Sequence, residues 1–456
     1  MSTNGLTMRV AQWASEQTTV PDEIRHHVTR LVLDHLAGVV AGSGTPVSMA
    51  VAAHARATYG GASATGIGAG KLSAPGAAFV NGTAAHGLEV DDGYTPGSVH
   101  PSAVALPAVL ATAQRLEAGP ERTLAASAVA LELTCRLAAA GHPATWRNHF
   151  HNTPLAGVIG AAAGVASLSD LTPDRVADAL GIAGSHAGGL FEFLGNSAEV
   201  KRVHPGKAAR DGVVSAELAS AGVTGPRTVL EGDNGYFAAF AGDDWAPDLV
   251  GDALGARWSM LDTYVKPYPS CRHLHGPIDA ALALRRRHWE ADRLSVADVA
   301  AAHVGTYAVA ARHADPEPGS LLDAQMSIPH AVSVALARGH VALDEFGESA
   351  RTDPETRRLA RAVTVEVDRA AEEAYPRARP AVLTLSLRDG RTLTETVEQP
   401  YGEPANPITD ASLTEKFHSL VDPVTGAGAA TALADAVWRM ADLSFLDHAD
   451  RLVRAV

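Results

Sequence analysis

The first half of the chain is a series of apolar segments at helical spacing, and this pattern constrains the fold most. One segment begins near Pro21, ends at Gly42 and places on one helical face Ile24, Val28, Leu31, Val32, Leu36, Val39 and Val40. Similar segments follow at 75–88, 101–118, 121–140, 154–168, 173–188 and 207–221. Most are rich in Ala and Gly. Because such small side chains let helices approach closely, we expect a compact bundle, and no fixed-period repeat is visible.

The periodicity changes after about residue 260. Residues 363–368 alternate with a period of two, and residues 382–387 are joined through Asp389-Gly390 to 392–397, as in a β-hairpin. Further elements are indicated as a strand at 304–309 and helices at 276–288 and 328–338. This part is therefore predicted to be α+β. Residues 410–456 turn helical again and could pack back on the first helices, with core positions at Leu433, Val437, Met440, Leu443 and Leu446.

Composition limits the class of protein and its partners. A chain of 456 residues with 46% hydrophobic and 19% charged residues is long enough for two ordinary domains, which is our expectation. It has no long uninterrupted apolar run and no signal-peptide core, so we expect a cytoplasmic protein that does not enter a membrane. The net charge of −14 argues against nucleic acid as a partner. Two cysteines are too few for a disulfide framework, and Cys135 lies in an apolar run, as a buried residue would.

Residues 81–106 form a loop rich in Gly and Pro that contains His86, Glu89, Asp91, Asp92 and His100. Pro101 is predicted to be the first residue of the next helix, which places His100 at the N-cap position. An imidazole at the positive end of a helix dipole is favoured in its neutral form, as a base acting on a carboxylate substrate would need to be. The alternative is a turn whose acids and histidine only cap helices.

Two more polar clusters interrupt the helical half. His151 immediately precedes the segment 154–168 and could meet an anion there, although a lone histidine is more often a hydrogen-bonded core residue. The densest positive cluster spans residues 201–210 and includes Lys201, Arg202 and His204. Because Pro205-Gly206 is expected to open a helix, backbone N–H groups and cationic side chains could converge there on a carboxylate. The alternative is a solvated basic helix face.

A fourth cluster, KPYPSCRHLH at residues 266–275, precedes a predicted helix. Cys271, His273 and His275 could be metal ligands, but the chain has no CxxC, no HExxH and no second ligand pair at a usual spacing, so we expect no metal. A nucleophilic Cys271 is conceivable in this basic surrounding, but general acid/base chemistry is favoured because no Gly-rich oxyanion turn adjoins it. The Gly-rich stretch 61–70 lacks the ending of a phosphate-binding loop, so no nucleotide cofactor is indicated.

Taken in order, five stretches resemble the MmgE/PrpD family, which includes 2-methylcitrate dehydratase, cis-aconitate decarboxylase and iminodisuccinate epimerase. They are NGTAAHGLEVDDGY with VHPSAVALP, FHNTPLAGVIGAAAGVASL, KRVHPGKAARDGVVSAELASAGVTGP, VKPYPSCRHLHGPIDAAL and AQMSIPHAVSVAL. The resemblance implies a mainly α fold, with an all-helical domain from residues 1–266 and 402–456 and an inserted α+β lid domain from residues 267–401. It also implies a homodimer and a site, free of metal and cofactor, between these domains.

The resemblance also indicates candidate site residues. His100, His151, Lys201 and Lys266 match family active-site positions, where lysines hold carboxylates and histidines move the proton. His330 stands where relatives often have Tyr and is the fifth catalytic candidate. The candidates for substrate binding are Glu89, Asp92, Arg202, His204, Cys271, Arg272 and His273.

Three departures from the family pattern bear on the reaction. The usual Leu-Asp-Phe-Asp/Asn-Asp-Thr reads LEVDDG at residues 88–93, so Glu89 takes an Asp position and Gly93 replaces Thr. The loop from there to His100 is one residue longer than in the decarboxylase. Cys271 occupies a position where the animal decarboxylase has histidine.

The predicted function is a cofactor-independent lyase that removes a proton α to a carboxylate and eliminates water or CO2 from a small di- or tricarboxylate. The alternative is an epimerase of a dicarboxylate, for which His330 could supply the second base. A non-catalytic binding protein is disfavoured because His100, His151, Lys201 and Lys266 are all retained.

Overall fold

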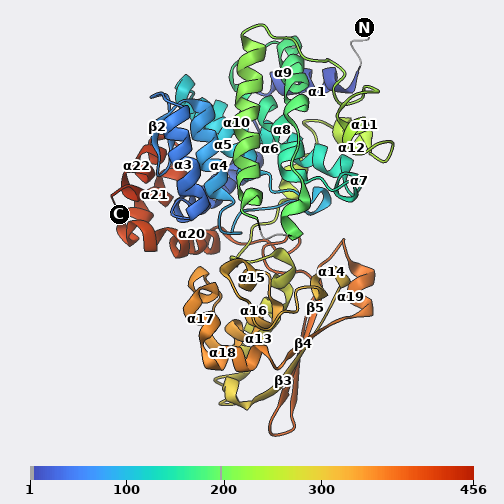
Figure 1. The fold of residues 1–456 in the computed structure, drawn as a ribbon, viewed down its shortest axis with the longest axis vertical. Coiled ribbons are helices and arrows are strands. Elements are labelled where there is room, and N and C mark those ends of the chain that lie inside the picture. Colours follow the sequence, from blue (N-terminus) through green and yellow to red (C-terminus); the bar gives the residue numbers. More distant parts are fainter. Residues whose placement is uncertain (1–4, 196–197, 456) are drawn as a thin grey trace. The chain divides into compact units, whose positions relative to one another are not determined.

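The chain is organised around a helix without a polar face, α8 (Asn152–Leu168), which is buried along its whole length. In this computed structural model, which describes residues 5–195 and 198–455, α8 packs among α5 (Ser102–Leu116), α6 (Pro120–Gly141), α9 (Pro173–His186) and α10 (Val200–Ser220). A Cβ added at Gly164 would lie 2.6 Å from the Ala130 Cβ, so α8 and α6 approach closely only because this position has no side chain. Figure 1 shows α8, α9 and α10 running side by side.

The chain divides into two compact units. Unit 1 comprises residues 1–264 and 409–456, and unit 2 comprises residues 265–408. The boundaries thus fall at 264/265 and 408/409, where the sequence had led us to expect 266/267 and 401/402. The mainly α fold with a smaller α+β part is confirmed. The other elements of unit 1 are α1 (Leu6–Glu16), α2 (Asp22–Gly42), α3 (Pro46–Thr58), β1 (Ala64–Gly66), β2 (Gly70–Leu72), α4 (Ala74–Ala85), η1 (Thr95–Gly97), α7 (Ala144–Arg147), η2 (Phe191–Gly195), α11 (Tyr236–Phe240), α12 (Pro247–Gly251), η3 (Ser259–Asp262), α20 (Asp410–Thr425), α21 (Ala427–Arg439) and α22 (Ser444–Val453).

The predicted helix at 207–221 begins too late. In the structure α10 begins at Val200, and Pro205 and Gly206 lie inside it. The reason is the crossing of α10 and α4, where a Cβ added at Gly82 would lie 2.8 Å from the Gly206 Cα. Pro205-Gly206 therefore marks a close helix contact, and the expectation that it opens a helix was wrong.

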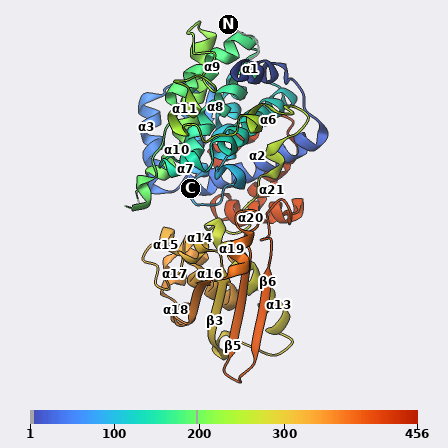
Figure 2. The same ribbon diagram turned by 90° about the vertical axis from the view of Figure 1, so that its right-hand side faces the viewer.

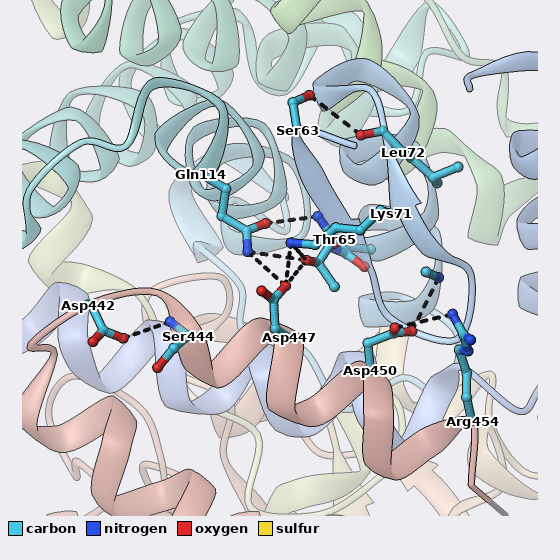
Figure 3. A network of polar contacts seen from close by, with 12 residues as sticks. Ser63, Thr65, Lys71, Leu72, Gln114, Asp442, Ser444, Asp447, Asp450 and Arg454 are labelled. Atoms are coloured by element: carbon cyan, nitrogen blue, oxygen red, sulfur yellow. Dashed lines mark hydrogen bonds and ion pairs between the residues drawn. The ribbon is translucent and has the colours of Figure 1, made fainter. Parts of the chain in front are cut away.

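The C-terminal tail packs against the N-terminal helices of its own unit. Its predicted core positions are all buried, namely Leu433, Val437, Met440, Leu443 and Leu446. Helix α20 packs against α2. Helix α22 is tied to the β1–β2 hairpin by the polar network in Figure 3. There Asp447 accepts hydrogen bonds from Lys71 Nζ at 2.6 Å and Gln114 Nε2 at 3.4 Å. The Asp450 carboxylate accepts from the backbone N–H groups of Gly68 and Gly70 at 3.0 and 3.2 Å.

Unit 2 is built on a four-stranded sheet in the order β4-β3-β5-β6. Only β3 and β4 are parallel, and β5 and β6 form the long hairpin that Figure 2 shows. The predicted hairpin and the strand at 363–368 are confirmed, while the strand indicated at 304–309 is β3 and begins earlier, at Val299. The elements of unit 2 are η4 (Arg272–Leu274), α13 (His275–His288), η5 (Val296–Asp298), β3 (Val299–Thr306), α14 (Ala308–Ala311), α15 (Leu321–Gln325), α16 (Ile328–Arg338), η6 (Leu343–Phe346), α17 (Glu348–Thr352), α18 (Pro354–Ala360), β4 (Val363–Val367), α19 (Arg369–Ala374), β5 (Ala381–Leu387) and β6 (Thr392–Val397).

The sheet of unit 2 has one covered side. Along β5 alternate residues from Ala381 to Leu387 are buried, and α13 and α16 pack on the sheet. The core between helices and strands includes Ile278, Leu284, Val332 and Leu385. The period-two pattern in the sequence records this one-sided burial.

Helix α6 is long and apolar enough to cross a membrane by length and composition alone. However, 94% of its apolar window is buried inside the structure, as in the core helix of a globular domain. Helices α2 and α3 meet the same criterion only as a pair, and that pair is bent by 92°. Cys135 lies in α6 and is fully buried, as predicted.

Candidate active site

The loop after α4 is held in place by the C-terminal tail. Lys416 Nζ on α20 donates a hydrogen bond of 2.7 Å to the Val90 carbonyl and forms a buried ion pair with Asp34. Within the loop, Glu89 has a left-handed backbone conformation with a φ of 58°, which is unfavourable for a residue with a side chain. Contacts from a distant segment therefore fix a strained loop.

Asp91 anchors two imidazoles in this loop. Its Oδ2 lies 2.6 Å from His86 Nδ1 and 3.3 Å from His100 Nδ1. Burial raises the pKa of Asp91, but the adjacent His86 and His100 outweigh this effect and hold the pKa well below its usual range. Asp91 is thus an ionised carboxylate behind two histidines. Neither Asp91 nor His86 was among the site candidates, because only their shared place in the acidic loop indicated them.

His100 is oriented as a base. Its Nδ1 lies 2.8 Å from the Asp92 carbonyl oxygen, which can only accept a hydrogen bond, so this nitrogen carries the proton and Nε2 carries the lone pair. Its backbone N–H donates to Thr153 Oγ1 at 3.2 Å. The side chain is 18% exposed, so it is accessible to a small molecule.

Asp92 accepts hydrogen bonds from the first residue of α5. The expectation that His100 occupies the N-cap position was wrong. The helix begins at Ser102, whose backbone N–H and hydroxyl donate to the Asp92 carboxyl group at 3.2 and 2.8 Å. Burial raises the pKa of Asp92 to about 8, with smaller contributions from Asp91 and Asp34 against the Ser102 hydrogen bonds. Asp92 is fully buried and contacts His100 through its carbonyl. Its binding of substrate stays a prediction.

His151 and His204 extend the group of imidazoles. Their Nδ1 atoms lie 3.0 Å apart, and the ring centroids of His86 and His151 are separated by 6.3 Å. Burial, and then the charges of His86, His204 and Lys201, hold the pKa of His151 well below its usual range. Burial and neighbouring positive groups likewise lower the pKa of His204 to about 4. Both rings are therefore neutral near pH 7, and one donates its proton to the other.

Lys201 reaches the acidic loop from the first turn of α10 and pairs with the carboxylate of Glu89. The Glu89 side chain is 4% exposed and the Lys201 side chain is 21% exposed, so Lys201 is the more accessible residue of this pair. Glu89 thereby aligns Lys201 beside the histidines.

The remaining cations of the 201–210 cluster do not converge on one point. Arg202 pairs with Glu199 at 2.8 Å, Lys207 donates to the His186 carbonyl at 3.0 Å, and Arg210 pairs with Asp211 at 2.7 Å. The convergent anion site expected from the sequence is therefore reduced to Lys201. The cause is the earlier start of α10, which distributes these residues around a helix.

The replacement of the family's Thr by Gly93 has a packing reason. Gly93 pairs with Tyr264 through two backbone hydrogen bonds of 3.1 and 2.8 Å. A Cβ added at Gly93 would overlap the Tyr264 ring. A side chain at position 93 would require the Tyr264 ring to move, and the hydroxyl of the family motif has no counterpart there.

In unit 2, Lys266 is 1% exposed, and its charge contributes to the lowered pKa of Cys271. Burial raises the pKa of the Cys271 thiol, but His313, whose Nε2 lies 4.0 Å from Sγ, outweighs it. The same contact raises the pKa of His313 against the effect of burial. Sequence reasoning missed His313 because no local motif surrounds it, and only the fold brings it to Cys271.

Arg272 and His273 have defined partners in unit 2. Arg272 Nε pairs with Glu403 at 2.9 Å, and the Arg272 Nη1 atom lies 2.7 Å from His275 Nδ1. The His273 Nδ1 atom lies 2.6 Å from the Tyr307 hydroxyl. Arg272 is therefore held by acceptors of its own unit, and its binding of substrate stays a prediction.

His330 lies at the start of α16, where its Nε2 is 2.9 Å from the Glu345 carbonyl and its ring packs against Phe346. It is 2% exposed, and burial lowers its pKa. Among the contacts found within residues 5–195 and 198–455, none joins His330 to another candidate. Its catalytic role stays a prediction.

In the part of the chain that the structure describes, two groups have ligand atoms close enough to hold a metal ion, namely His86, Asp91 and His100 in unit 1, and Cys271, His273 and His313 in unit 2. In each group these atoms lie within 4.8 Å of one another. In the first group the three side chains also lie close together without an ion, because the Asp91 carboxylate contacts and orients both imidazoles.

Comparison with known proteins places the chain in a family. Residues 9–248 match the MmgE/PrpD N-terminal domain and residues 268–441 match the MmgE/PrpD C-terminal domain. The cis-aconitate decarboxylase of Aspergillus terreus is 28% identical, with 97% of this chain and 95% of the relative covered. The cis-aconitate decarboxylase of Homo sapiens is 27% identical, with 87% and 83% covered. The resemblance seen in the five sequence stretches is confirmed, and the chain belongs to the MmgE/PrpD family.

Proposed function

We propose that the protein is a lyase that eliminates CO2 or water from a small di- or tricarboxylate by proton transfer next to a carboxylate, without a cofactor. The observation that carries this proposal is the contact of Asp91 with His100, together with the Asp92 carbonyl that fixes the proton of His100 on Nδ1. A base of this kind, beside an accessible lysine, suits a carboxylate substrate. The similarity to cis-aconitate decarboxylases supports the same class of reaction.

In dehydration, the lone pair on His100 Nε2 would take the proton α to a carboxylate. The C–H electrons pass into that carboxylate and return to form the carbon–carbon double bond as the β-hydroxyl takes a proton from the His100 imidazolium and leaves as water. Lys201 would stabilise the negative charge that develops on the carboxylate oxygens. Asp91 would stabilise the imidazolium that forms on His100.

In decarboxylation, the carbon–carboxylate bond breaks and its electron pair enters the remaining conjugated system. An imidazolium, for which His100 beside Asp91 is the candidate, then gives its proton to carbon and becomes neutral. Because burial keeps His151 and His204 neutral, their contact could resupply that proton through Nδ1 without placing two charges side by side. Glu89 would keep Lys201 aligned until a substrate carboxylate arrives.

Epimerisation of a dicarboxylate is the second candidate. It needs a second base on the opposite face of the reacting carbon. The group of imidazoles around His86 and His151 contains more than one ring, which is the observation that favours it. Among the described residues no contact joins the expected second base, His330, to another candidate, so we rank epimerisation below elimination.

Lys266 and the neighbouring Cys271 and His273 are proposed to contribute to the same reaction, on the strength of the family resemblance alone. A homodimer and a cytoplasmic location are proposed on the same basis. Light scattering of the purified chain checks the first, and fractionation of the source cells checks the second.

The test is incubation with cis-aconitate, citrate and 2-methylcitrate in deuterated water, followed by NMR. Elimination gives a new alkene or an alkene that has lost CO2, whereas epimerisation gives deuterium on an unchanged carbon skeleton. Binding without exchange or product for each acid would instead support a non-catalytic protein. His100→Ala and Lys201→Met should remove turnover. Lys207→Met is the matched control, because that lysine lies on the same helix but donates to the His186 carbonyl.

A further inference from the structure

Cys271, His273 and His313 bring a thiol and two imidazoles together on unit 2. Cys271 immediately precedes η4, His273 lies within it, and His313 follows α14. One ligand atom from each side chain lies within 4.8 Å of the other two, and all three residues are partly exposed. We propose that these three residues form a binding site for a soft divalent metal ion, of which Zn²⁺ is the physiological example.

The donor set selects the ion. One thiolate and two imidazole nitrogens suit Zn²⁺ and Co²⁺, while Mg²⁺ and Ca²⁺ prefer oxygen ligands. In a tetrahedral zinc site the donor atoms are roughly 3.4–3.6 Å apart. The Cys271 Sγ and His313 Nε2 atoms are 4.0 Å apart, so this pair must close by a few tenths of an ångström, and the other pairs, which lie within 4.8 Å, must close by at most roughly 1.4 Å. Three protein ligands leave a fourth position for water.

Both imidazoles have the outer contacts that metal-binding histidines use. The Tyr307 hydroxyl lies 2.6 Å from His273 Nδ1 and can accept its proton, which leaves Nε2 as the metal ligand. Tyr307 is itself fixed, since it is 1% exposed and stacks on Tyr375 at 4.3 Å. The His313 ring hydrogen-bonds the Met326 backbone. The ligands are therefore held in place before an ion arrives.

The backbone of the site is also tied together. The Cys271 N–H donates to the Gln325 carbonyl at 2.8 Å, and the Ile328 N–H donates to the His313 carbonyl at 2.8 Å. The short segment 325–328 thus joins the two ligand-bearing segments. Two segments separated by 42 residues in sequence are held at a fixed spacing.

The nearby charges are compatible with a cation. Arg272 and Arg379 lie close to His273, but both pair with Glu403 at 2.9 Å, and the thiol of Cys271 adds a negative charge when it loses its proton to bind the ion. His275, the third ligand that sequence spacing suggested, is fully buried and contacts Arg272, so His313 takes its place.

Metal binding can be measured without turnover. The full chain, reduced and freed of metal by a chelator, is titrated with Co²⁺ under anaerobic conditions. We expect one Co²⁺ per chain, bound in the micromolar range or tighter, with a thiolate-to-cobalt charge-transfer band that added Zn²⁺ removes. Cys271→Ser should abolish the band, and Tyr307→Phe should weaken binding roughly 10–100-fold.

Matched variants make the test decisive. Cys135→Ala removes the only other cysteine and should leave the band intact, and His303→Ala changes an exposed histidine of the same unit and should have no effect. The proposal is overturned if Co²⁺ does not bind saturably, if the band survives in Cys271→Ser, or if His275→Ala abolishes binding while His313→Ala does not. The proposal is also overturned if Co²⁺ binds without a charge-transfer band and this binding is lost in His100→Ala, because the ion would then lie in unit 1. Circular dichroism confirms that each variant is folded.

One consequence rests on the proposed function. Because Cys271 and His273 are candidates for substrate binding, Zn²⁺ should inhibit turnover, and His313→Ala should resist that inhibition. If the protein has no lyase activity, the spectroscopic titration still decides whether the metal site exists. The two proposals therefore fail independently.

Discussion

Replacing Asp91 by Asn tests the arrangement of the histidines most directly. The substitution keeps the size and the polar atoms of the side chain but removes the charge that lies 3.3 Å from His100 Nδ1 and 2.6 Å from His86 Nδ1. If Asp91 acts by stabilising the imidazolium of His100, turnover must fall by an amount set by that charge. The loss should appear in kcat rather than in KM, because Asp91 is buried behind the ring.

The expected loss is about 100-fold. In the Ser-His-Asp proteases the same replacement lowers kcat by roughly 10⁴-fold, largely because the histidine adopts the wrong tautomer. Here the Asp92 carbonyl, 2.8 Å away, keeps the proton of His100 on Nδ1, so only the charge is lost. A unit charge at 3.3 Å contributes roughly 5 kcal/mol at an effective dielectric constant of about 20. With the proton about half transferred in the transition state, roughly 2.5 kcal/mol remains, which corresponds to about two powers of ten in rate.

The assay is the NMR measurement of product formation with the best substrate found, at saturating concentration. His100→Ala sets the lower limit, and Asp447→Asn, in the tail network of Figure 3, is the control for removing a carboxylate elsewhere in unit 1. A loss below about threefold would refute the role of Asp91 in stabilising the imidazolium. A loss as large as that of His100→Ala in a folded variant would refute the argument that Asp92 preserves the tautomer.

Three further predictions concern stability. Lys416→Met leaves the buried carboxylate of Asp34 without its cation and should lower the free energy of unfolding in urea by about 3–5 kcal/mol; a change below about 1 kcal/mol contradicts this. Asp92 has a folded-state pKa of about 8, above its unfolded value, so its ionisation destabilises the fold as pH rises from about 4 to about 8. Melting temperatures across that range should therefore show Asp92→Asn gaining stability relative to the native chain, and a constant difference would exclude the raised pKa. Gly206→Ala should destabilise by about 1–3 kcal/mol in thermal unfolding, because its Cβ overlaps α4, whereas Gly428→Ala, with open space around it in a helix, should be neutral or slightly stabilising.

The sequence predicted the elements whose residues repeat at a regular spacing. The helices α2, α6 and α8 and the β5–β6 hairpin are close to their expected bounds, because burial on one side, or on all sides, leaves a periodic trace. The start of α10 was missed, since Pro205-Gly206 signals a helix start locally while its actual cause is the contact with α4. Rules for helix starts use only neighbouring residues in the sequence, so they do not register a contact with a distant helix.

The site was predictable in part for the same reason. Resemblance to the family indicated His100, His151 and Lys201, and the structure brings these residues into one group in unit 1. The resemblance did not indicate that the Asp91 carboxylate contacts two histidines, or that His313 lies beside Cys271. Such pairings depend on which buried atoms face each other, and that is set by packing over long stretches of chain.

The bond between Lys416 and the Val90 carbonyl has a consequence for how the protein is made. The two residues are separated by 326 positions, so at roughly 5–20 residues per second a ribosome needs tens of seconds between them. Throughout that interval Asp34 lacks its cation and the strained backbone at Glu89 lacks its support. The nascent helical half therefore emerges before the loop after α4 has its full support, and that loop is completed only when the final helices have left the exit tunnel.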